Sequence, residues 1–340
     1  MKAATAGAAD LYTLVRKGLA ASNVGNEARR PFRFLLCGDP GLVAELRALL
    51  LWGRDVSVPL DAPATLETID PLRIKTVVTA DAKAVIVLGR PGDLAGAGVD
   101  LLRQLRLPIF ALTVDPASAR LAPEGAPLLP TPTAAPLAGE MAEYVVPAIE
   151  REALRARFFP HLLERCRGIE VAVGRRLPAV RETVASKLTR DAAMNALKIS
   201  ATSALADNIP LLGIVLGAVA SAGDMVAITG VQVVLMMQIG AVYGKDPDAK
   251  RVWEMLPVVG GGLGWRALSR QLSGFIPVAG VAVKGAVAYA GTIAVGESVA
   301  FFYEQGRHMT SAQAEKIYDE RRRAAMQFAR EMIARLRSKR

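Results

Sequence analysis

The chain has 340 residues, of which 52% are hydrophobic and 5% aromatic, with a formal net charge of +10 and an isoelectric point near 9.8. This length excludes a miniprotein held together by disulfides, and a charged share of 22% excludes disorder along the whole chain. A mean hydropathy of +0.29 beside so much positive charge indicates that apolar and basic residues occupy separate segments. We therefore do not expect a uniformly soluble enzyme.

Cysteine and histidine are scarce, which limits the chemistry open to the chain. Cys37 and Cys166 are too far apart in sequence for a disulfide framework, and His161 and His308 form no zinc-binding pattern. We expect no metal site. The residues after Met1 contain no apolar segment followed by a cleavage site, so no secretory signal is visible. We therefore expect the chain to stay in a reducing cytoplasm.

The first half of the chain has the pattern of an α/β domain. Residues 1–30 are small and polar, and we expect a flexible lead-in. Short apolar runs then alternate with helical patterns over 31–150, with strands predicted at 32–37, 84–88 and 107–112 and helices at 42–52 and 97–105. Strands that alternate with helices predict a mainly parallel sheet. A Pro-rich run at 123–136 leads to one further predicted helix near 139–157.

The second half predicts an all-α domain that is partly transmembrane. Residues 151–204 form a basic helical neck, followed by two apolar helical hairpins over 205–305. Residues 208–223 and 225–244 are uncharged, with only Asp224 between them, and a second apolar block at 275–303 is interrupted only by Lys284 and Glu297. A 20-residue helix is about 30 Å long, which matches the hydrocarbon core of a bilayer.

The loop after the first predicted strand, with Gly38, Asp39 and Gly41, lies where a nucleotide-binding fold carries its phosphate loop. Such a loop needs the pattern GxxxxGK[ST], because its glycines expose backbone N–H groups, its Lys neutralises phosphate and its hydroxyl holds magnesium. Counting from Gly38, those three positions hold Val43, Ala44 and Glu45. We therefore predict the strand–turn–helix of a degenerate P-loop fold; nucleotide hydrolysis remains the less favoured alternative.

Two later segments resemble GTPase motifs that have lost their chemical residues. Asp61 begins a DxxG-like segment, a motif expected after a strand, and the glycine position of this segment holds Ala64. Asp115 ends an [NT]KxD-like segment, also expected after a strand, whose first two positions hold Leu112 and Thr113. Asp115 retains the carboxylate that would accept hydrogen bonds from a guanine edge. The three segments occur in the order expected of a G domain, so we predict a G-like head in which GTP and Mg²⁺ are disfavoured as cofactors.

Residues 195–305 resemble the bacterial domain-of-unknown-function family 697, which is found beside GTPase domains and in inner-membrane proteins. The resemblance is based on 204–210, Asp224, 231–232, 236–237, 239–244, 275–280 and 291–296, and it covers about a third of the chain. It implies membrane association and partnership with a G domain. It implies no reaction and no catalytic residue.

The apolar segments contain residues suited to helix packing in lipid. Gly213 and Gly217 form a GxxxG pattern, which lets two helix backbones approach closely. Lys284 lies within an apolar block, where a charge is costly unless it is paired. Glu297 lies about 220° around the same helix, so we predict that Asp224 pairs with Lys284. The alternative is that Asp224 and Lys284 both lie at interfacial turns in contact with water.

The last segment, 306–340, predicts a basic amphipathic helix capped by Ser311. Apolar residues recur at helical spacing at Ile317, Met326, Phe328, Met332, Ile333 and Leu336. The basic residues expected to bind an anionic membrane surface are Arg321, Arg322, Arg323, Arg330, Arg335, Arg337, Lys339 and Arg340. A solvated or partner-packing helix is the alternative, and nucleic acid is disfavoured because no aromatic residues alternate with the charges.

Together these patterns predict a non-catalytic scaffold or regulator at the cytoplasmic (inner) membrane, with a pseudo-GTPase head. Both ends would face the cytoplasm, because positive charge flanks the apolar region on each side. Its partners would be the lipid membrane and a protein partner or a second copy of the chain. Two alternatives remain open, namely an atypical active GTPase coupled to a membrane domain and a soluble protein whose apolar helices form a core or an oligomer interface.

Overall fold

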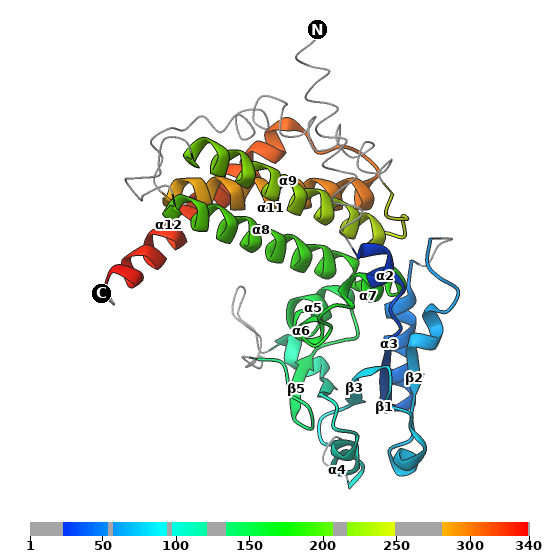
Figure 1. Ribbon diagram of the computed structural model, residues 1–340. Coiled ribbons are helices and arrows are strands. Elements are labelled where there is room, and N and C mark those ends of the chain that lie inside the picture. The colour runs from blue at the N-terminus through cyan, green and yellow to red at the C-terminus, as the bar shows by residue number, and fades with distance from the viewer. Residues whose placement is uncertain are drawn as a thin grey trace. The chain divides into compact units, whose positions relative to one another are not determined.

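The computed structural model describes residues 23–53, 57–93, 97–120, 134–206, 216–248 and 281–338 (Figure 1). The chain divides into two compact units. An α/β unit comprises Asn26–Val184 with Val242–Gly244, and a helical unit includes Ala185–Ala241 and Lys245–Arg340. The predicted succession of an α/β domain and a helical C-terminal part is confirmed.

In the described residues, a parallel sheet of five strands forms the centre of the α/β unit. Its order is β2-β1-β3-β4-β5. The strands are β1 (Arg33–Gly38), β2 (Leu66–Thr68), β3 (Ala82–Gly89), β4 (Ile109–Val114) and β5 (Met141–Val146). The three predicted strands correspond to β1, β3 and β4, with ends that differ by one or two residues. All three are almost wholly buried, as their continuous apolar runs require in a sheet covered on both faces.

Six short helices are described in and next to this unit, and α3 and α5 contact the sheet. They are α2 (Val24–Arg29), α3 (Pro40–Leu51), α4 (Ala97–Leu102), α5 (Arg151–Arg157), α6 (Phe159–Glu164) and α7 (Glu170–Arg176). In α3 the buried residues are Leu42, Val43, Leu46 and Leu50, which share one helical face. The rings of Phe110, Tyr144 and Phe158 lie 5.6–5.8 Å apart and join β4 and β5 to the helices.

The prediction of one helix near 139–157 is wrong over its first half. Residues Met141–Val146 form β5, and α5 begins only at Arg151. Tyr144, Val145 and Val146 favour a strand, and Pro147 blocks helical continuation, so the signal was present in the sequence. Burial raises the pKa of Tyr144 to about 12, and its hydroxyl lies 2.9 Å from His161 Nδ1.

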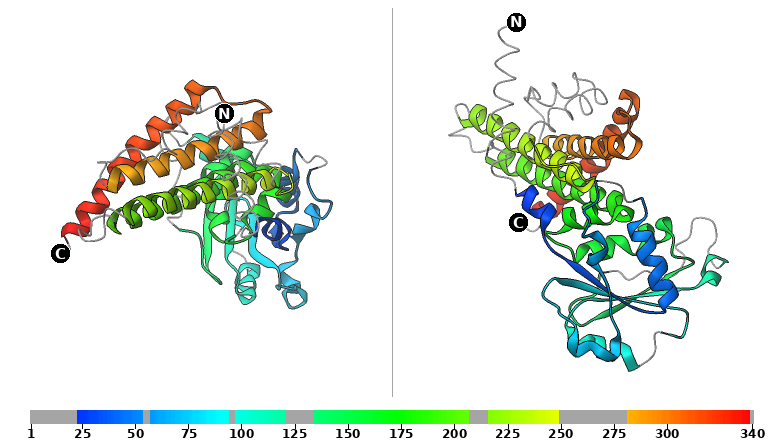
Figure 2. Two further views of the ribbon diagram at one scale, coloured as in Figure 1. Left: turned by 45° about the horizontal axis from the view of Figure 1, so that its top comes forward. Right: turned by 90° about the vertical axis from the view of Figure 1, so that its right-hand side faces the viewer.

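The helical unit contains four long helices in the described residues. They are α8 (Arg181–Ala206), whose first turn belongs to the α/β unit, α9 (Leu216–Val242), α11 (Val281–Gln305) and α12 (Ser311–Ser338). Helices α9 and α11 lie side by side in the left view of Figure 2, and α8 contacts α11 through Thr189 and Leu197. Glycines allow α11 to approach α8 closely, because a Cβ on Gly285 would lie 2.7 Å from Leu197 Cδ1 and one on Gly296 would lie 2.2 Å from Thr189 Oγ1.

Each apolar block contributes one continuous helix to the described residues. Helix α9 runs through Asp224 without a break, and α11 runs through Lys284 and Glu297. The remaining parts of the two predicted hairpins, 208–215 and 275–280, lie outside the described residues. Among the described helices, Gly285–Gln305 in α11 is long and apolar enough to cross a membrane, whereas Ala227–Val242 is shorter.

Helices α11 and α12 form an antiparallel hairpin. Gly306 at the turn has a φ of 66°, and its N–H donates to Phe302 O. Helix α12 begins with a capping box, in which the N–H of Gln313 donates to Thr310 Oγ1 and the N–H of Thr310 donates to Gln313 Oε1. The cap is therefore Thr310 and not the predicted Ser311, which is the first residue of the helix.

Candidate functional site

The carboxyl edge of the sheet is where an open parallel α/β sheet binds a ligand, at the point where the strand order reverses. In the order β2-β1-β3-β4-β5 this point lies between β1 and β3. The chain leaves β1 through Gly38 and Asp39, and it leaves β3 through Arg90 and the turn to Asp93. Gly38, Asp39, Gly41 and Asp115 all lie at this edge, because they end or follow the carboxyl ends of β1 and β4.

The turn between β1 and α3 contains a single residue, Asp39, and it leaves no room for a phosphate loop. A carboxylate oxygen of Asp39 accepts the Leu42 N–H at 2.9 Å, and Pro40 at the start of α3 has no N–H to offer. Backbone N–H groups of the first helical turn are what an anion at a helix N-terminus requires. The Asp39 carboxylate thus takes a backbone donor that a phosphate at this helix terminus would need, so the residues of this turn do not fit the phosphates of a nucleoside triphosphate.

Packing explains both glycines that flank this turn. Gly38 has a φ of 109°, and a Cβ there would lie 1.9 Å from Leu88 O of the adjacent strand. The N–H of Asp39 donates to the same carbonyl at 2.8 Å. A Cβ on Gly41 would lie 3.1 Å from Asp39 Oδ1, so a side chain would press on the capping carboxylate. Gly38 therefore allows close approach of β1 to β3, and Gly41 leaves space for the cap.

The carboxylates that follow the other strands are also used by local turns. Asp70 after β2 accepts the Leu72 N–H at 2.9 Å, and Asp115 after β4 accepts the Ala117 N–H at 2.9 Å. Asp93 after β3 accepts the Arg90 N–H at 3.0 Å. Aspartate is favoured at such positions because its short side chain satisfies backbone donors. Capping alone accounts for an aspartate after each of these strands.

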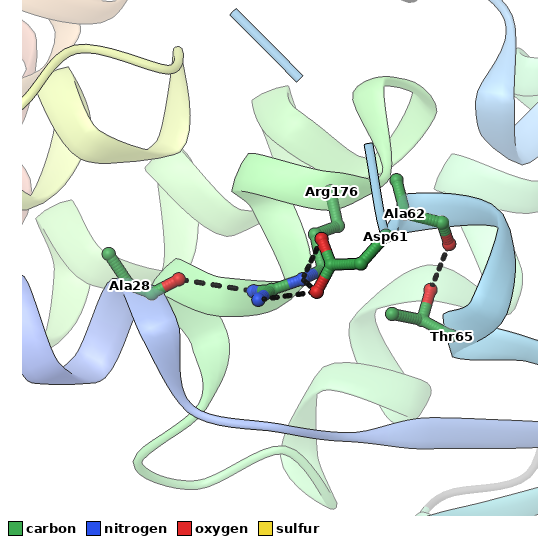
Figure 3. Close-up of polar contacts among 5 residues, drawn as sticks. All are labelled: Ala28, Asp61, Ala62, Thr65 and Arg176. Carbon is green, nitrogen blue, oxygen red and sulfur yellow. Dashed lines mark hydrogen bonds and ion pairs between the residues drawn. The ribbon is translucent and has the colours of Figure 1, made fainter. Parts of the chain in front are cut away.

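Asp61 lies at the opposite edge of the sheet, which corrects its predicted place after a strand. It precedes the 3₁₀ helix Ala62–Thr65, which leads into the amino end of β2. Its carboxylate binds the guanidinium of Arg176, with Nη2–Oδ2 and Nε–Oδ2 distances of 3.1 and 3.2 Å (Figure 3). Arg176 also donates to Ala28 O at 3.1 Å and lies over the ring of Phe32. Asp61 therefore joins the 3₁₀ helix to α7 and, through Arg176, to α2.

The carboxylate that follows β2, the edge strand beside β1, is that of Asp70. The sequence analysis did not single out Asp70. Strand β2 has only three residues, too few for a periodic apolar pattern to reveal it. The sequence Leu66–Asp70 does contain a short apolar and β-branched run that ends in Asp, and this was the available signal. Asp70, and not Asp61, is therefore the carboxylate that follows β2.

The helical unit brings together two residues of the family-697 pattern. The side-chain amide of Gln232 on α9 donates to Thr292 Oγ1 on α11 at 3.3 Å, and the Thr292 hydroxyl donates to Ala288 O at 2.9 Å. Such polar contacts fix the register of two apolar helices. Gly217 and Asp224 lie on α9 and Lys284 on α11, while Gly213 and the predicted Asp224–Lys284 contact lie outside the described residues and side chains.

The basic residues of α12 divide into those with local partners and those beyond the described side chains. Arg321 pairs with Glu297 of α11 at 3.3 Å, and Arg322 pairs with Asp319 at 3.5 Å. Arg323 donates to the backbone of Asp319 and is exposed. Arg330, Arg335 and Arg337 lie on α12 with side chains that are not described, and Lys339 and Arg340 lie outside the described residues.

Among the described residues, no three His, Cys, Asp or Glu side chains are grouped so as to hold a metal ion. Burial raises the pKa of the Cys37 thiol to about 12, which makes it a poor nucleophile. The described arrangement thus offers capping and packing contacts at the positions expected of a G domain. Comparisons with family models, with curated proteins and with solved structures found no match, so the resemblance to family 697 stays a prediction.

Proposed function

We propose that this protein is a non-catalytic, membrane-associated scaffold or regulator with a G-like head that does not bind a nucleoside triphosphate. The head presents a folded surface to a protein partner or to a second copy of the chain. The helical unit associates with the cytoplasmic membrane, and both ends of the chain face the cytoplasm.

The observation that carries the proposal for the head is the contact between Asp39 and the Leu42 N–H at 2.9 Å. A phosphate at this helix would have to displace a carboxylate of like charge, and Pro40 provides one N–H fewer than an ordinary helix start. The all-parallel order β2-β1-β3-β4-β5 supports a head of the doubly wound type that nucleotide-binding domains share.

The proposal for membrane association is supported by α11 and α12. The segment Gly285–Gln305 has the length and composition of a membrane span. Helix α12 is amphipathic, and its second half carries Arg330, Arg335 and Arg337 among apolar residues. Basic amphipathic helices bind anionic membrane surfaces through both features.

Titration of the full-length protein with GTP and Mg²⁺ tests the head. We expect no saturable heat of binding at concentrations up to about 1 mM, which corresponds to a binding free energy weaker than about −4 kcal/mol. Micromolar affinity would refute the proposal and would favour an atypical GTPase.

A second candidate, a soluble scaffold with α11 as its core helix, is favoured by one observation. Of the most apolar stretch of α11, 67% is buried inside the protein. Sedimentation with vesicles separates the two candidates. A membrane-associated protein binds vesicles that contain anionic phosphatidylglycerol and binds neutral vesicles weakly, whereas a soluble scaffold remains in the supernatant with both.

A further inference from the structure

Helix α11 is enclosed by protein over its central turns. Every residue from Ala290 to Gly296 is buried, although seven successive positions cover all sides of a helix. Helix α8 contributes Thr189 and Leu197, α9 contributes Gln232, and α12 packs along the remaining side. The apolar surface that suits α11 to lipid is thus covered by neighbouring helices.

Two of those neighbours are amphipathic and carry charges level with the middle of α11. Gly296 lies three residues from the midpoint of α11, which is about 5 Å along the axis. It contacts Thr189, and the next two residues of α8, Arg190 and Asp191, are exposed. Glu297 pairs with Arg321, whose side chain is 54% exposed.

A bilayer around this bundle would have to accommodate these charges near its centre. Each Arg or Asp at that depth costs roughly 2.5–3.5 kcal/mol even on the lower of the measured scales. Membrane insertion of α11 in the present arrangement is therefore strongly disfavoured. Binding of the folded bundle to a membrane surface carries no such cost.

Of the contacts that cover α11, the contact with α12 can be released by movement about a single short connection. The two helices are joined by residues 306–310, and Gly306 to His308 are exposed. Arg307 lies over the ring of Phe301 at 4.9 Å, and Met309 packs against Ser298. Rotation about this short connection would separate the helices along their length while α12 remained attached.

We propose that the contact between α11 and α12 masks a lipid-binding surface. An anionic bilayer competes with α11 for α12, whose sequence carries an apolar stripe and basic residues. Release of α12 exposes to the membrane surface the side of α11 that α12 had covered, while α8 stays packed on α11. The free protein holds the hairpin closed, and the bilayer-bound protein holds it open. This inference rests on the proposed membrane association and names the surface and the lipid class that produce it.

A cross-link between the two helices tests the proposal in the full-length protein. Glu297→Cys with Arg321→Cys replaces the ion pair that bridges α11 and α12, and a short bis-maleimide joins the two thiols. Cys37 and Cys166 are buried and do not compete for the reagent. Lys187→Cys with Asp191→Cys is the matched control, because its cross-link lies within α8. Each protein is sedimented with phosphatidylglycerol vesicles and washed at about 1 M salt, where the Debye length falls to about 3 Å.

We expect the uncross-linked hairpin variant and the cross-linked α8 control to remain on the vesicles after the salt wash. The cross-linked hairpin should sediment before the wash and lose at least about 90% of its bound fraction in it, because only surface attraction remains. Equal retention of the locked and unlocked hairpins would refute the masked surface while leaving membrane association intact. Failure of every variant to sediment would refute membrane association and the masked surface together.

Discussion

The substitution Gly296→Ala tests how closely α11 packs against α8. A Cβ at this position would lie 2.2 Å from Thr189 Oγ1, 2.5 Å from Thr189 Cγ2 and 2.9 Å from Thr189 Cβ. Thr189 is 3% exposed, so its side chain has no free space into which it can turn. One of the two helices must therefore shift to accommodate the methyl group.

The magnitude follows from two opposing effects. Alanine in a helix interior is favoured over glycine by about 1 kcal/mol. Overpacking of a buried contact costs about 1–3 kcal/mol, and a helix shift would also loosen the adjacent contact of Gly285 with Leu197. We expect a net loss of about 1–2 kcal/mol in the free energy of unfolding of the helical unit.

Gly230→Ala in α9 is the control, because no atom lies within 4 Å of its Cβ position. It should stabilise the protein by about 0.5–1 kcal/mol through helix propensity alone. Urea unfolding followed by circular dichroism at 222 nm compares the variants, and Thr189→Ala combined with Gly296→Ala should recover part of the loss. If Gly296→Ala stabilises as much as Gly230→Ala, the close approach of α11 to α8 is wrong.

Three further predictions concern the α/β unit. Asp61→Asn should destabilise by about 1–2 kcal/mol, since it removes the opposite charge from the buried Arg176 guanidinium while Asp61 itself is 59% exposed. Arg176→Met should cost less, because the remaining carboxylate is solvated. A smaller loss for Asp61→Asn than for Arg176→Met in urea unfolding would contradict this asymmetry. Asp39→Ala should cost about 1 kcal/mol through loss of the α3 cap, measured in the same way, with Asp39→Asn as the variant that retains a capping oxygen. The Cys37 thiol should resist iodoacetamide at pH 8–9 in the native protein and react in urea. Because its folded pKa is raised from 9.0 to about 12, stability should fall as pH rises from 9 toward 12, and rapid native labelling at pH 8 would contradict the burial.

The strands of the sheet were predictable where local pattern alone carries the signal. Continuous apolar runs located β1, β3 and β4, because a strand buried on both faces needs apolar residues at every position. Strand β2 escaped notice because three residues show no period, and β5 was assigned to a helix although Tyr144 to Val146 favour a strand. Edge strands are less buried and so carry a weaker apolar signal.

The predicted site residues were located with uneven success for a physical reason. Gly38, Asp39 and Asp115 follow predicted strands, so their place at the carboxyl edge follows from a parallel sheet. Asp61 was placed after a strand because its segment resembles DxxG. In the structure Asp61 precedes β2, which the sequence analysis missed, and so it lies at the amino edge of the sheet. The capping role of Asp39 also lay outside the motif comparison, because it depends on a turn of one residue and on where the Leu42 N–H points.

Composition and periodicity by themselves determined that an α/β head precedes a helical, apolar and basic C-terminal part, because burial of apolar side chains leaves a pattern in the order of residues. Tertiary structure alone decided the order of the strands, the edge at which each carboxylate lies and the burial of α11 between α8, α9 and α12. These features depend on contacts between residues far apart in the chain, such as Asp61 with Arg176 and Gly296 with Thr189. No local pattern records such contacts, since each partner satisfies the same local preferences wherever the other lies.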